Sequence, residues 1–238
     1  MNWSEWTLPI RHLPVPDSGV VDVWLCQLPR SEEDASALRF RQQFVLRLLL
    51  AAYLDTPGKD IAIRRDQHGK PELVNQPLQF NVAHSGHWWA LAVSSNGAVG
   101  IDVETDRSVR DPLALARRFF HPSAAAHLEA IKQASMRQSR FLQLWTAHEA
   151  VVKAMGLGLA RGLSGLLFDP NKEPLSLHQV PAGWPAAEQW TLHQMQEPSP
   201  LTISVAAPQP KLTLSLRRLD ASALSAAIAT PQQPRPAG

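Results

Sequence analysis

The segment Gly100-Ile101-Asp102-Val103-Glu104 alternates apolar and acidic side chains, which is the period of a β-strand. Side chains two residues apart on a strand point to the same face, so the two carboxylates converge while Ile101 and Val103 face a core. Two carboxylates that close repel each other unless a cation or a proton lies between them, and oxygen ligands of this kind suit Mg²⁺. Taken alone, however, such a pair is more often an ordinary strand end with solvated acids.

A predicted helix over residues 141–155 adds a third acid. Glu149 and Lys153 lie one turn apart on a shared face of this helix. In isolation this pair is also typical of a plain surface salt bridge, worth about 0.3–0.5 kcal/mol. His148-Glu149 matches the start of a zinc protease helix, but that motif needs a second histidine where the chain has Val152. The sequence therefore argues against a zinc protease.

A basic turn precedes these acids in the chain. Gly69-Lys70-Pro71 follows Arg65, and it places a lysine on a turn that glycine opens and proline stiffens. Such a lysine can contact a phosphate as a point charge. A basic loop in solvent fits the same residues.

A second polar segment ends a predicted strand. Residues 80–85, Phe-Asn-Val-Ala-His-Ser, end in the imidazole of His84 and the hydroxyl of Ser85, next to Gly86. The glycine allows a ligand to approach the backbone. A lone histidine is nevertheless more often structural than functional.

The bulk composition excludes several classes of protein. With 238 residues, 45% hydrophobic and 18% charged, the chain is long enough for one large domain or two small halves. A formal net charge of +2 is too small to indicate nucleic acid as the main partner. The single cysteine, Cys26, excludes an internal disulfide and suits a reducing compartment, so we expect a cytoplasmic location. No stretch approaches the ~20 apolar residues of a membrane span, and no secretion signal is evident.

The order of the predicted elements indicates an α+β fold. A strand and a helix come first, three strands follow, and after Pro112 the pattern becomes helical before it returns to strands. Two α+β halves would then meet between residues 100 and 112, which places Asp102 and Glu104 at a seam where ligand clefts tend to form. No sequence repeat proves a duplication. The predicted parts are a flexible N-terminal arm at 1–16, an N-terminal half at 17–105, a C-terminal half at 106–220 and a disordered tail at 221–238.

These segments occur together and in a fixed order, and the set resembles the Sfp-like 4′-phosphopantetheinyl transferases. The resemblance implies a pseudo-twofold fold of two similar α+β halves, with coenzyme A and Mg²⁺, or Mn²⁺ in its place, in the cleft between them. It covers residues 65 to about 158. The matching motifs are Gly69-Lys70-Pro71, Phe80-Asn81-Val82-Ala83-His84-Ser85, Gly100-Ile101-Asp102-Val103-Glu104 and Trp145-Thr146-Ala147-His148-Glu149-Ala150-Val151-Val152-Lys153.

The resemblance also implies a role for each matched residue. Asp102, Glu104 and Glu149 would hold the metal, and Lys153 would meet the phosphate. Lys70 and Arg65 would lie at the nucleotide end, and His84 with Ser85 would lie at the 3′-phosphate region of coenzyme A. The other coenzyme A contacts that the motifs imply are Gly69, Pro71 and Ala83.

The implied reaction moves the phosphopantetheine arm of coenzyme A onto a serine of an apo acyl, polyketide or peptidyl carrier protein. Glu149 or a metal-bound water would take the proton of that serine as it attacks the β-phosphorus. Lys153 would stabilise the departing adenosine 3′,5′-bisphosphate, and Asp102 completes the predicted catalytic set.

Two positions and one region depart from the family pattern. His148 stands where the family commonly has a lysine, and Ala83 replaces a serine that often precedes the histidine. The region 29–44 looks shortened, so the basic residues that grip the nucleotide have no certain match. Arg41 and Arg47 are the candidates for that role.

Carrier proteins of this kind are small and acidic, so we expect a basic and apolar patch near the cleft. Arg117, Arg118 and Phe119-Phe120 are candidates, although the phenylalanines fit a core equally well. Two other functions remain open: a Mg²⁺-dependent phosphodiesterase that removes the same arm, and a degenerate, non-catalytic module that binds a carrier or a nucleotide. A monomer is expected, because two halves already supply the cleft.

Overall fold

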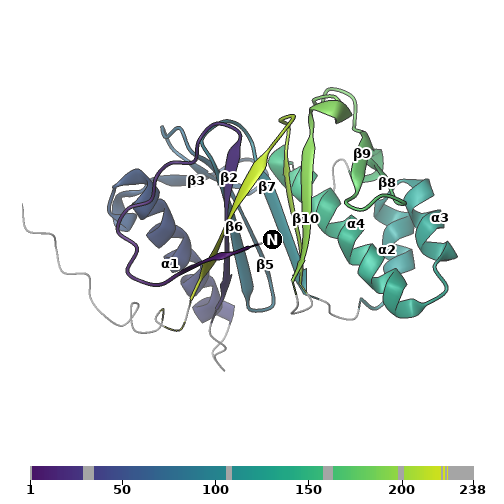
Figure 1. Ribbon diagram of the computed structural model, residues 1–238, viewed down its shortest axis with the longest axis horizontal. Helices are drawn as coiled ribbons and strands as arrows, with labels where there is room; N and C mark the ends of the chain where they lie inside the picture. Colours follow the sequence, from purple (N-terminus) through teal and green to yellow (C-terminus); the bar gives the residue numbers. More distant parts are fainter. Residues whose placement is uncertain are drawn as a thin grey trace, which may run out of the picture.

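The computed structural model describes residues 2–28, 35–105, 109–157, 163–197, 201–220, 222 and 224. Helices and sheets are mixed along the chain, so the predicted α+β class is confirmed (Figure 1). The twofold relation between the halves stays a prediction. In the described part of the chain, none of the helices combines the length and the apolar character that a membrane crossing requires.

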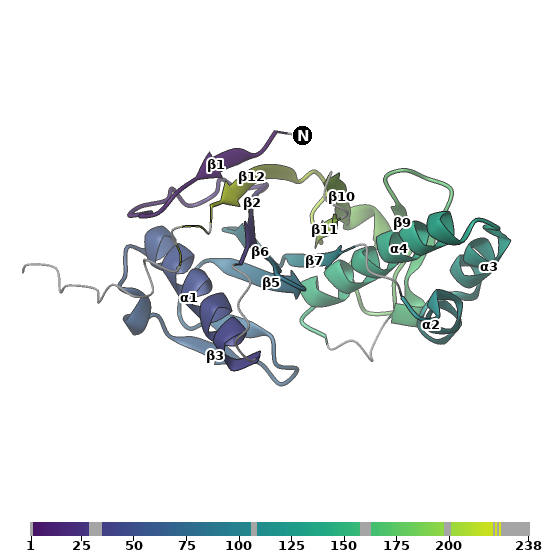
Figure 2. The ribbon, with the colours of Figure 1, turned by 90° about the horizontal axis from the view of Figure 1, so that it is seen from below.

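A five-stranded sheet forms one side of the molecule, in the order β1-β12-β2-β6-β5. The long helix α1 (Ala35–Leu54) covers one of its faces, and Leu46, Leu49 and Leu50 pack there against Trp24 and Leu91 (Figure 2). β12 runs parallel to β1 and β2, whereas β6 is antiparallel to β2 and to β5. The strands are β1 (Ser4–Trp6), β2 (Val20–Gln27), β5 (Gln79–Ser85), β6 (Trp88–Ser94) and β12 (Thr213–Leu219).

A three-stranded antiparallel sheet, β10-β11-β7, forms the other side. Helix α4 (Ala134–Ala154) packs on it, and the shorter α2 (Pro112–Phe119) and α3 (Pro122–Ala130) lie against α4 (Figure 2). The strands are β7 (Gly100–Thr105), β10 (Thr191–Glu197) and β11 (Leu201–Ala207). The remaining elements are the hairpins β3 (Ile63–Arg65) with β4 (Pro71–Leu73) and β8 (Leu167–Asp169) with β9 (Ser176–Gln179), and the 3₁₀ turns Gly58–Asp60, Leu163–Gly165 and Ala187–Gln189.

Side chains of β5 join the two sheets. The side-chain oxygen of Asn81 accepts the backbone N–H of Ile101 at 2.9 Å, and the hydroxyl oxygen of Ser85 accepts the N–H of Thr105 at 3.2 Å. Apolar residues from both sheets, among them Val23 of β2, form one cluster with Ile101. The acids of β7 therefore lie where the two sheets meet.

The predicted halves exchange strands across this seam. β7 falls in the predicted N-terminal half but pairs with β11, and β12 falls in the predicted C-terminal half but pairs with β2. Within the predicted N-terminal arm, residues 4–6 form β1 and pair with β12. Of the predicted tail, only residues 222 and 224 are among the described residues, and Leu224 is buried.

Aromatic and ionic contacts help to hold β1 and β12 in the five-stranded sheet. Arg217 of β12 donates to Asp22 of β2 at 3.0 Å, and its guanidinium lies over the rings of Trp6 and Trp24. Tyr53 of α1 donates to the other oxygen of Asp22 at 2.5 Å. Because Asp22 is buried, removing its cationic partner would leave a costly uncompensated charge.

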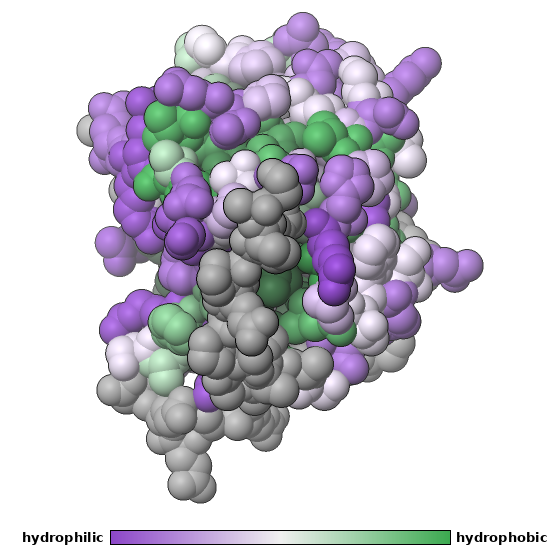
Figure 3. Space-filling view, turned by 90° about the vertical axis from the view of Figure 1, so that its left-hand side faces the viewer, coloured by the Kyte–Doolittle hydropathy of each residue, from purple (hydrophilic) through white to green (hydrophobic). Residues whose placement is uncertain are grey.

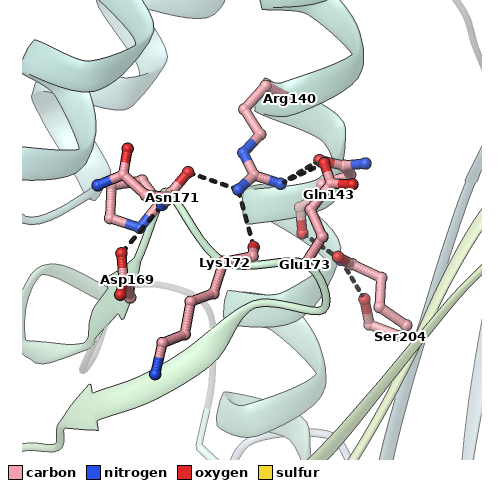
Figure 4. Close-up of polar contacts among 9 residues, drawn as sticks. Arg140, Gln143, Asp169, Asn171, Lys172, Glu173 and Ser204 are labelled. Carbon is pink, nitrogen blue, oxygen red and sulfur yellow. Dashed lines mark hydrogen bonds and ion pairs between the residues drawn. The ribbon is translucent and has the colours of Figure 1, made fainter.

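Polar contacts anchor α4 to its surroundings (Figure 4). The guanidinium of Arg140 donates to the backbone oxygens of Pro170 and Lys172 in the turn between β8 and β9, and to the side chain of Gln143 at 2.6 Å. The hydroxyls of Thr146 and Ser204 lie 2.8 Å apart and bind α4 to β11. These bonds hold the helix in one position over the sheet.

The backbones of α4 and β7 approach each other closely at Gly100. A Cβ atom at this position would lie 1.9 Å from the backbone oxygen of Ala150 and 2.5 Å from the backbone nitrogen of Ala154. Because both neighbours are backbone atoms of a packed helix, neither can move aside cheaply. A glycine is therefore required for the helix to cross the strand at this point.

We predict that Gly100→Ala lowers the free energy of unfolding by about 3 kcal/mol or more, because the added methyl group pushes α4 away from β7. Urea unfolding followed by tryptophan fluorescence measures this. Gly183→Ala is the matched control: Gly183 has a φ of +84° and nothing within 4 Å of an added Cβ, so only about 1 kcal/mol of backbone strain is expected. Equal losses in the two variants would contradict the proposed close contact.

Candidate active site

Three acids and one lysine come together where α4 crosses β7. Asp102 is 6% exposed and Glu149 is 4% exposed. Lys153, one helical turn after Glu149, donates from its ammonium to the Oδ1 atom of Asp102 at 2.6 Å. Glu104 lies two residues along β7 from Asp102. The helix and strand that the sequence predicts thus place these four residues in one region.

Burial makes it unfavourable for Asp102 and Glu149 to be ionised at the same time. Burial, opposed by Lys153, raises the pKa of Asp102 to about 6. Burial and the charge of Asp102 raise the pKa of Glu149 to about 7. The Oδ2 atom of Asp102 and the Oε1 atom of Glu149 are buried, and neither has a hydrogen-bond partner among the described residues. The site therefore favours a proton or a further cation next to these oxygens.

The acids fit a divalent cation in their chemistry but are not arranged as a finished metal site. Within the described ranges, no group of three or more His, Cys, Asp or Glu side chains is close enough to hold a metal ion. Glu104 instead accepts a hydrogen bond from the hydroxyl of Ser85 at 2.6 Å. The donors are all carboxylate oxygens, and two of the buried ones lack a partner, so their chemistry fits Mg²⁺.

The strand β5 presents its predicted site residues to different sides. Ser85 is buried and contacts Glu104, whereas His84 is exposed. Ala83 is buried in the cluster between the two sheets. Adjacent residues of a strand alternate between faces, so His84 and Ser85 cannot act on the same atom from the same side.

The basic turn reaches the end of α4. The Nζ atom of Lys70 donates to the backbone oxygen of Lys153 at 2.7 Å, and Arg65 donates to the backbone oxygen of Gly69 at 2.7 Å. Pro71 begins β4 opposite Arg65. Burial lowers the pKa of Lys70, with Glu72 opposing the shift.

His148 lies on a different face of α4 from Glu149. It is 1% exposed and stacks on Phe120 at 4.3 Å between ring centroids, with Phe168 at 4.7 Å. One step along a helix turns the side chain by about 100°, so Glu149 faces the seam while its neighbour faces the core. Burial lowers the pKa of His148 to about 4, so the imidazole is neutral. At this position, where the family commonly has a lysine, the chain therefore has a neutral side chain packed in the core.

Other candidate residues have structural partners. Arg47 donates to the backbone oxygens of Gly58 at 2.6 Å and Ile61 at 3.0 Å, which occupies it in a turn after α1. Arg41 is half-buried on α1. On the same helix Phe40 is 58% exposed, and this end of the molecule shows apolar surface among hydrophilic residues (Figure 3). Residues 29–34 of the region predicted to be short lie outside the described residues.

The predicted partner patch is only partly exposed. Phe120 is buried in the core around α4, as the alternative interpretation of the sequence held. Arg118 lies 5.0 Å from the ring centre of the half-buried Phe119. Arg117 is exposed and donates to Glu129 at 2.7 Å. Of the four predicted residues, the two arginines and Phe119 remain available to a partner.

Two residues that shape the site, Gly100 and Asp66, carry only weak signals in the sequence. A glycine within a strand, such as Gly100, often marks a close backbone approach. The signal at Asp66 is its spacing. Asp66 lies three residues before Gly69, a spacing at which an aspartate often caps a turn through its own side chain.

Comparisons with known proteins agree on one family. A family model described as "4'-phosphopantetheinyl transferase superfamily" matches residues 98–204. A second, described as "4'-phosphopantetheinyl transferase, N-terminal", matches residues 30–96. The two matches meet close to the start of β7, and the first contains all three acids.

Curated relatives extend this similarity. A putative 4'-phosphopantetheinyl transferase, slr0495, of Synechocystis sp. is 35% identical over 173 residues, which is 63% of this chain and 70% of the relative. The 4'-phosphopantetheinyl transferase HetI of Nostoc sp. is 32% identical over 191 residues, which is 74% of this chain and 78% of the relative. The 4'-phosphopantetheinyl transferase gsp of Aneurinibacillus migulanus is 30% identical over 148 residues, 58% of this chain and 60% of the relative.

We predict that Glu149→Gln removes part of the pH dependence of stability in metal-free buffer. A folded-state pKa raised from 4.5 to about 7 stabilises the protein below pH 4.5, and this contribution is lost as the pH rises through about 7. The wild type should therefore lose on the order of 2 kcal/mol between pH 5 and pH 8 relative to the variant.

Urea unfolding of both proteins with EDTA at the two pH values measures this difference. Glu129→Gln, which changes an exposed acid, should follow the wild type. A pH dependence that Glu149→Gln leaves unchanged would show that Glu149 is not buried next to the other acids.

Proposed function

This chain belongs to the 4′-phosphopantetheinyl transferase superfamily, and from that premise we propose that it transfers the phosphopantetheine arm of coenzyme A to a serine of an apo carrier protein. The products are the holo carrier and adenosine 3′,5′-bisphosphate. The observation that carries the proposal is the meeting of Asp102 and Glu104 on β7 with Glu149 and Lys153 on α4. The carrier is of the acyl, polyketide or peptidyl type.

Asp102, Glu104 and Glu149 would hold Mg²⁺, or Mn²⁺ in its place. When bound, the ion neutralises charge on the pyrophosphate of coenzyme A. The unpartnered oxygens of Asp102 and Glu149 support this assignment, because each is buried where a carboxylate needs a cation. Ser85 holds Glu104 by one oxygen and keeps it in the region of the other two acids.

The residues of the site divide the chemical work. Glu149 accepts the proton of the carrier serine while the serine oxygen bonds to the β-phosphorus. The phosphoanhydride bond then breaks and releases adenosine 3′,5′-bisphosphate. Lys153 offers positive charge to the departing bisphosphate. Phosphoryl transfer depends mainly on such positioning and electrostatics.

The rim of the site supplies the binding contacts. Lys70, Arg65, Gly69 and Pro71 on the β3–β4 hairpin are proposed for the nucleotide end. His84 is exposed on β5 and available for the 3′-phosphate. The buried Ser85 and Ala83 would contribute by holding β5 in place, Ser85 through Glu104 and Ala83 through its packing between the two sheets.

We propose that the enzyme works as a cytoplasmic monomer, since the acids and the lysine all come from one chain. An acidic carrier would meet the basic residues of α2. Arg117 and Arg118 lie in the last turn of that helix, close to Phe119. Positive charge and a half-buried aromatic ring suit an acidic partner.

The central test is a transfer assay. Apo carrier proteins of the three types are incubated with coenzyme A, Mg²⁺ and the enzyme, and each carrier is weighed by mass spectrometry. We expect a gain of one phosphopantetheine mass, and at least a hundredfold loss of rate in Glu149→Gln, because the amide cannot accept the serine proton. Glu188→Gln, which changes an exposed acid away from the site and from α2, is the control and should transfer normally.

Three outcomes would contradict the proposal. No gain with any carrier would leave a non-catalytic binding module. Loss of the arm from a holo carrier would indicate a phosphodiesterase. Full activity of Glu149→Gln, with the wild type active, would mean that the base is another residue.

A second prediction concerns the metal without reference to activity. Mg²⁺ at a hundredfold excess over its Kd should stabilise the wild type by about 2.7 kcal/mol, since the ion binds the folded state. The melting temperature should then rise by several degrees. Asp102→Asn should remove this response, and Asp220→Asn, which changes an exposed acid, should keep it. Equal responses in the two variants would place the ion elsewhere.

A further inference from the structure

One lysine contact links the two predicted halves beside the proposed active site. The ammonium of Lys70, on the turn after β3, donates to the backbone oxygen of Lys153 at 2.7 Å, and 83 residues separate the two in sequence. Lys153 lies in the last turn of α4. Its backbone oxygen also accepts the backbone N–H of Gly156 at 3.1 Å. The last carbonyl groups of a helix carry the negative end of its dipole, so a cation there stabilises the helix end.

The turn that carries Lys70 is organised by Asp66. The Oδ1 atom of Asp66 accepts the backbone N–H of His68 at 2.8 Å and that of Lys70 at 2.9 Å. The backbone of Asp66 also donates to the oxygen of Lys70 and accepts from Gly69. Gly69 has a φ of +87°, which completes the turn. Asp66 therefore fixes the starting point of the Lys70 side chain.

Lys153 of α4 is held through both its backbone and its side chain. Its backbone oxygen receives Lys70, and its side-chain ammonium donates to the Oδ1 atom of Asp102 at 2.6 Å. A shift of the helix end would move the ammonium relative to Asp102. A misplacement of about 1 Å in an active site can cost about a hundredfold in rate.

We propose that Asp66 and Lys70 are positioning residues that hold the C-terminal end of α4 and thereby place the Lys153 ammonium for the transfer reaction. This inference rests on the proposed function. It gives the turn a role in addition to the proposed contact with the nucleotide. The two roles leave different kinetic signatures, because a lost ground-state contact raises KM, whereas a displaced catalytic group lowers kcat.

Asp66→Ala distinguishes these roles most sharply, because it breaks the turn without removing a positive charge. We expect kcat to fall about tenfold, in addition to any rise in the KM for coenzyme A that the altered turn causes. Asp66→Asn keeps an oxygen that can accept the same two N–H bonds, so it should retain most of the wild-type kcat. Asp220→Ala is the matched control, because Asp220 accepts the N–H of Ser222 in a similar turn elsewhere.

A double-mutant cycle tests whether Asp66 acts through Lys70. Lys70→Met should lower kcat by a similar factor, and the double variant should be no slower than Lys70→Met alone. Independent effects would instead multiply. Urea unfolding of every variant shows whether a loss of rate reflects a loss of folded protein at the assay temperature.

The wild-type rate separates failure of this inference from failure of the proposed function. If the wild type transfers no phosphopantetheine, the proposed function is wrong. If the wild type is active, a fall in kcat that is non-additive and that Asp66→Asn restores supports the positioning role. Any other pattern, including a change confined to KM or multiplying effects, overturns it.

Discussion

The backbone contact between helix α4 and strand β7 at Gly100 is the constraint on which the rest of the structure depends. With no side chain at that position, the carbonyl of Ala150 and the N–H of Ala154 lie against the strand. Glu149 precedes this contact and Lys153 lies within it, so both reach the acids of β7. A larger residue would separate the helix from the strand, and the acids would lose both their burial and their lysine.

The same close packing accounts for the unusual electrostatics. Burial is the main cause of the raised pKa values of Asp102 and Glu149, and Lys153 neutralises only part of the charge. Such a cluster is costly without a further cation, and natural proteins keep such arrangements mainly at functional sites. Stability and function therefore oppose each other here, and the core around α4 and the contacts of Arg140 and Arg217 offset the cost.

Much of the site follows from local periodicity. The alternation of Asp102 and Glu104 with apolar residues predicts a strand with both acids on one face, and the helical spacing of Glu149 and Lys153 predicts their shared face. Both patterns depend only on neighbours in the chain. The placement of β12 beside β2 and of β1 beside β12 was beyond such reasoning, because parallel pairing joins distant segments and leaves no local pattern.

By itself, the sequence determined the α+β class, the strand and helix that bear the acids, and the family, since these rest on residue type and spacing. Only the tertiary structure decided which way each side chain faces and what it contacts. It placed His148 between aromatic rings, turned Ser85 toward Glu104, and joined Lys70 to the end of α4. The physical reason is that the partner of a side chain depends on how elements distant in the sequence pack together. At Gly100 this packing is possible only because the residue has no Cβ atom.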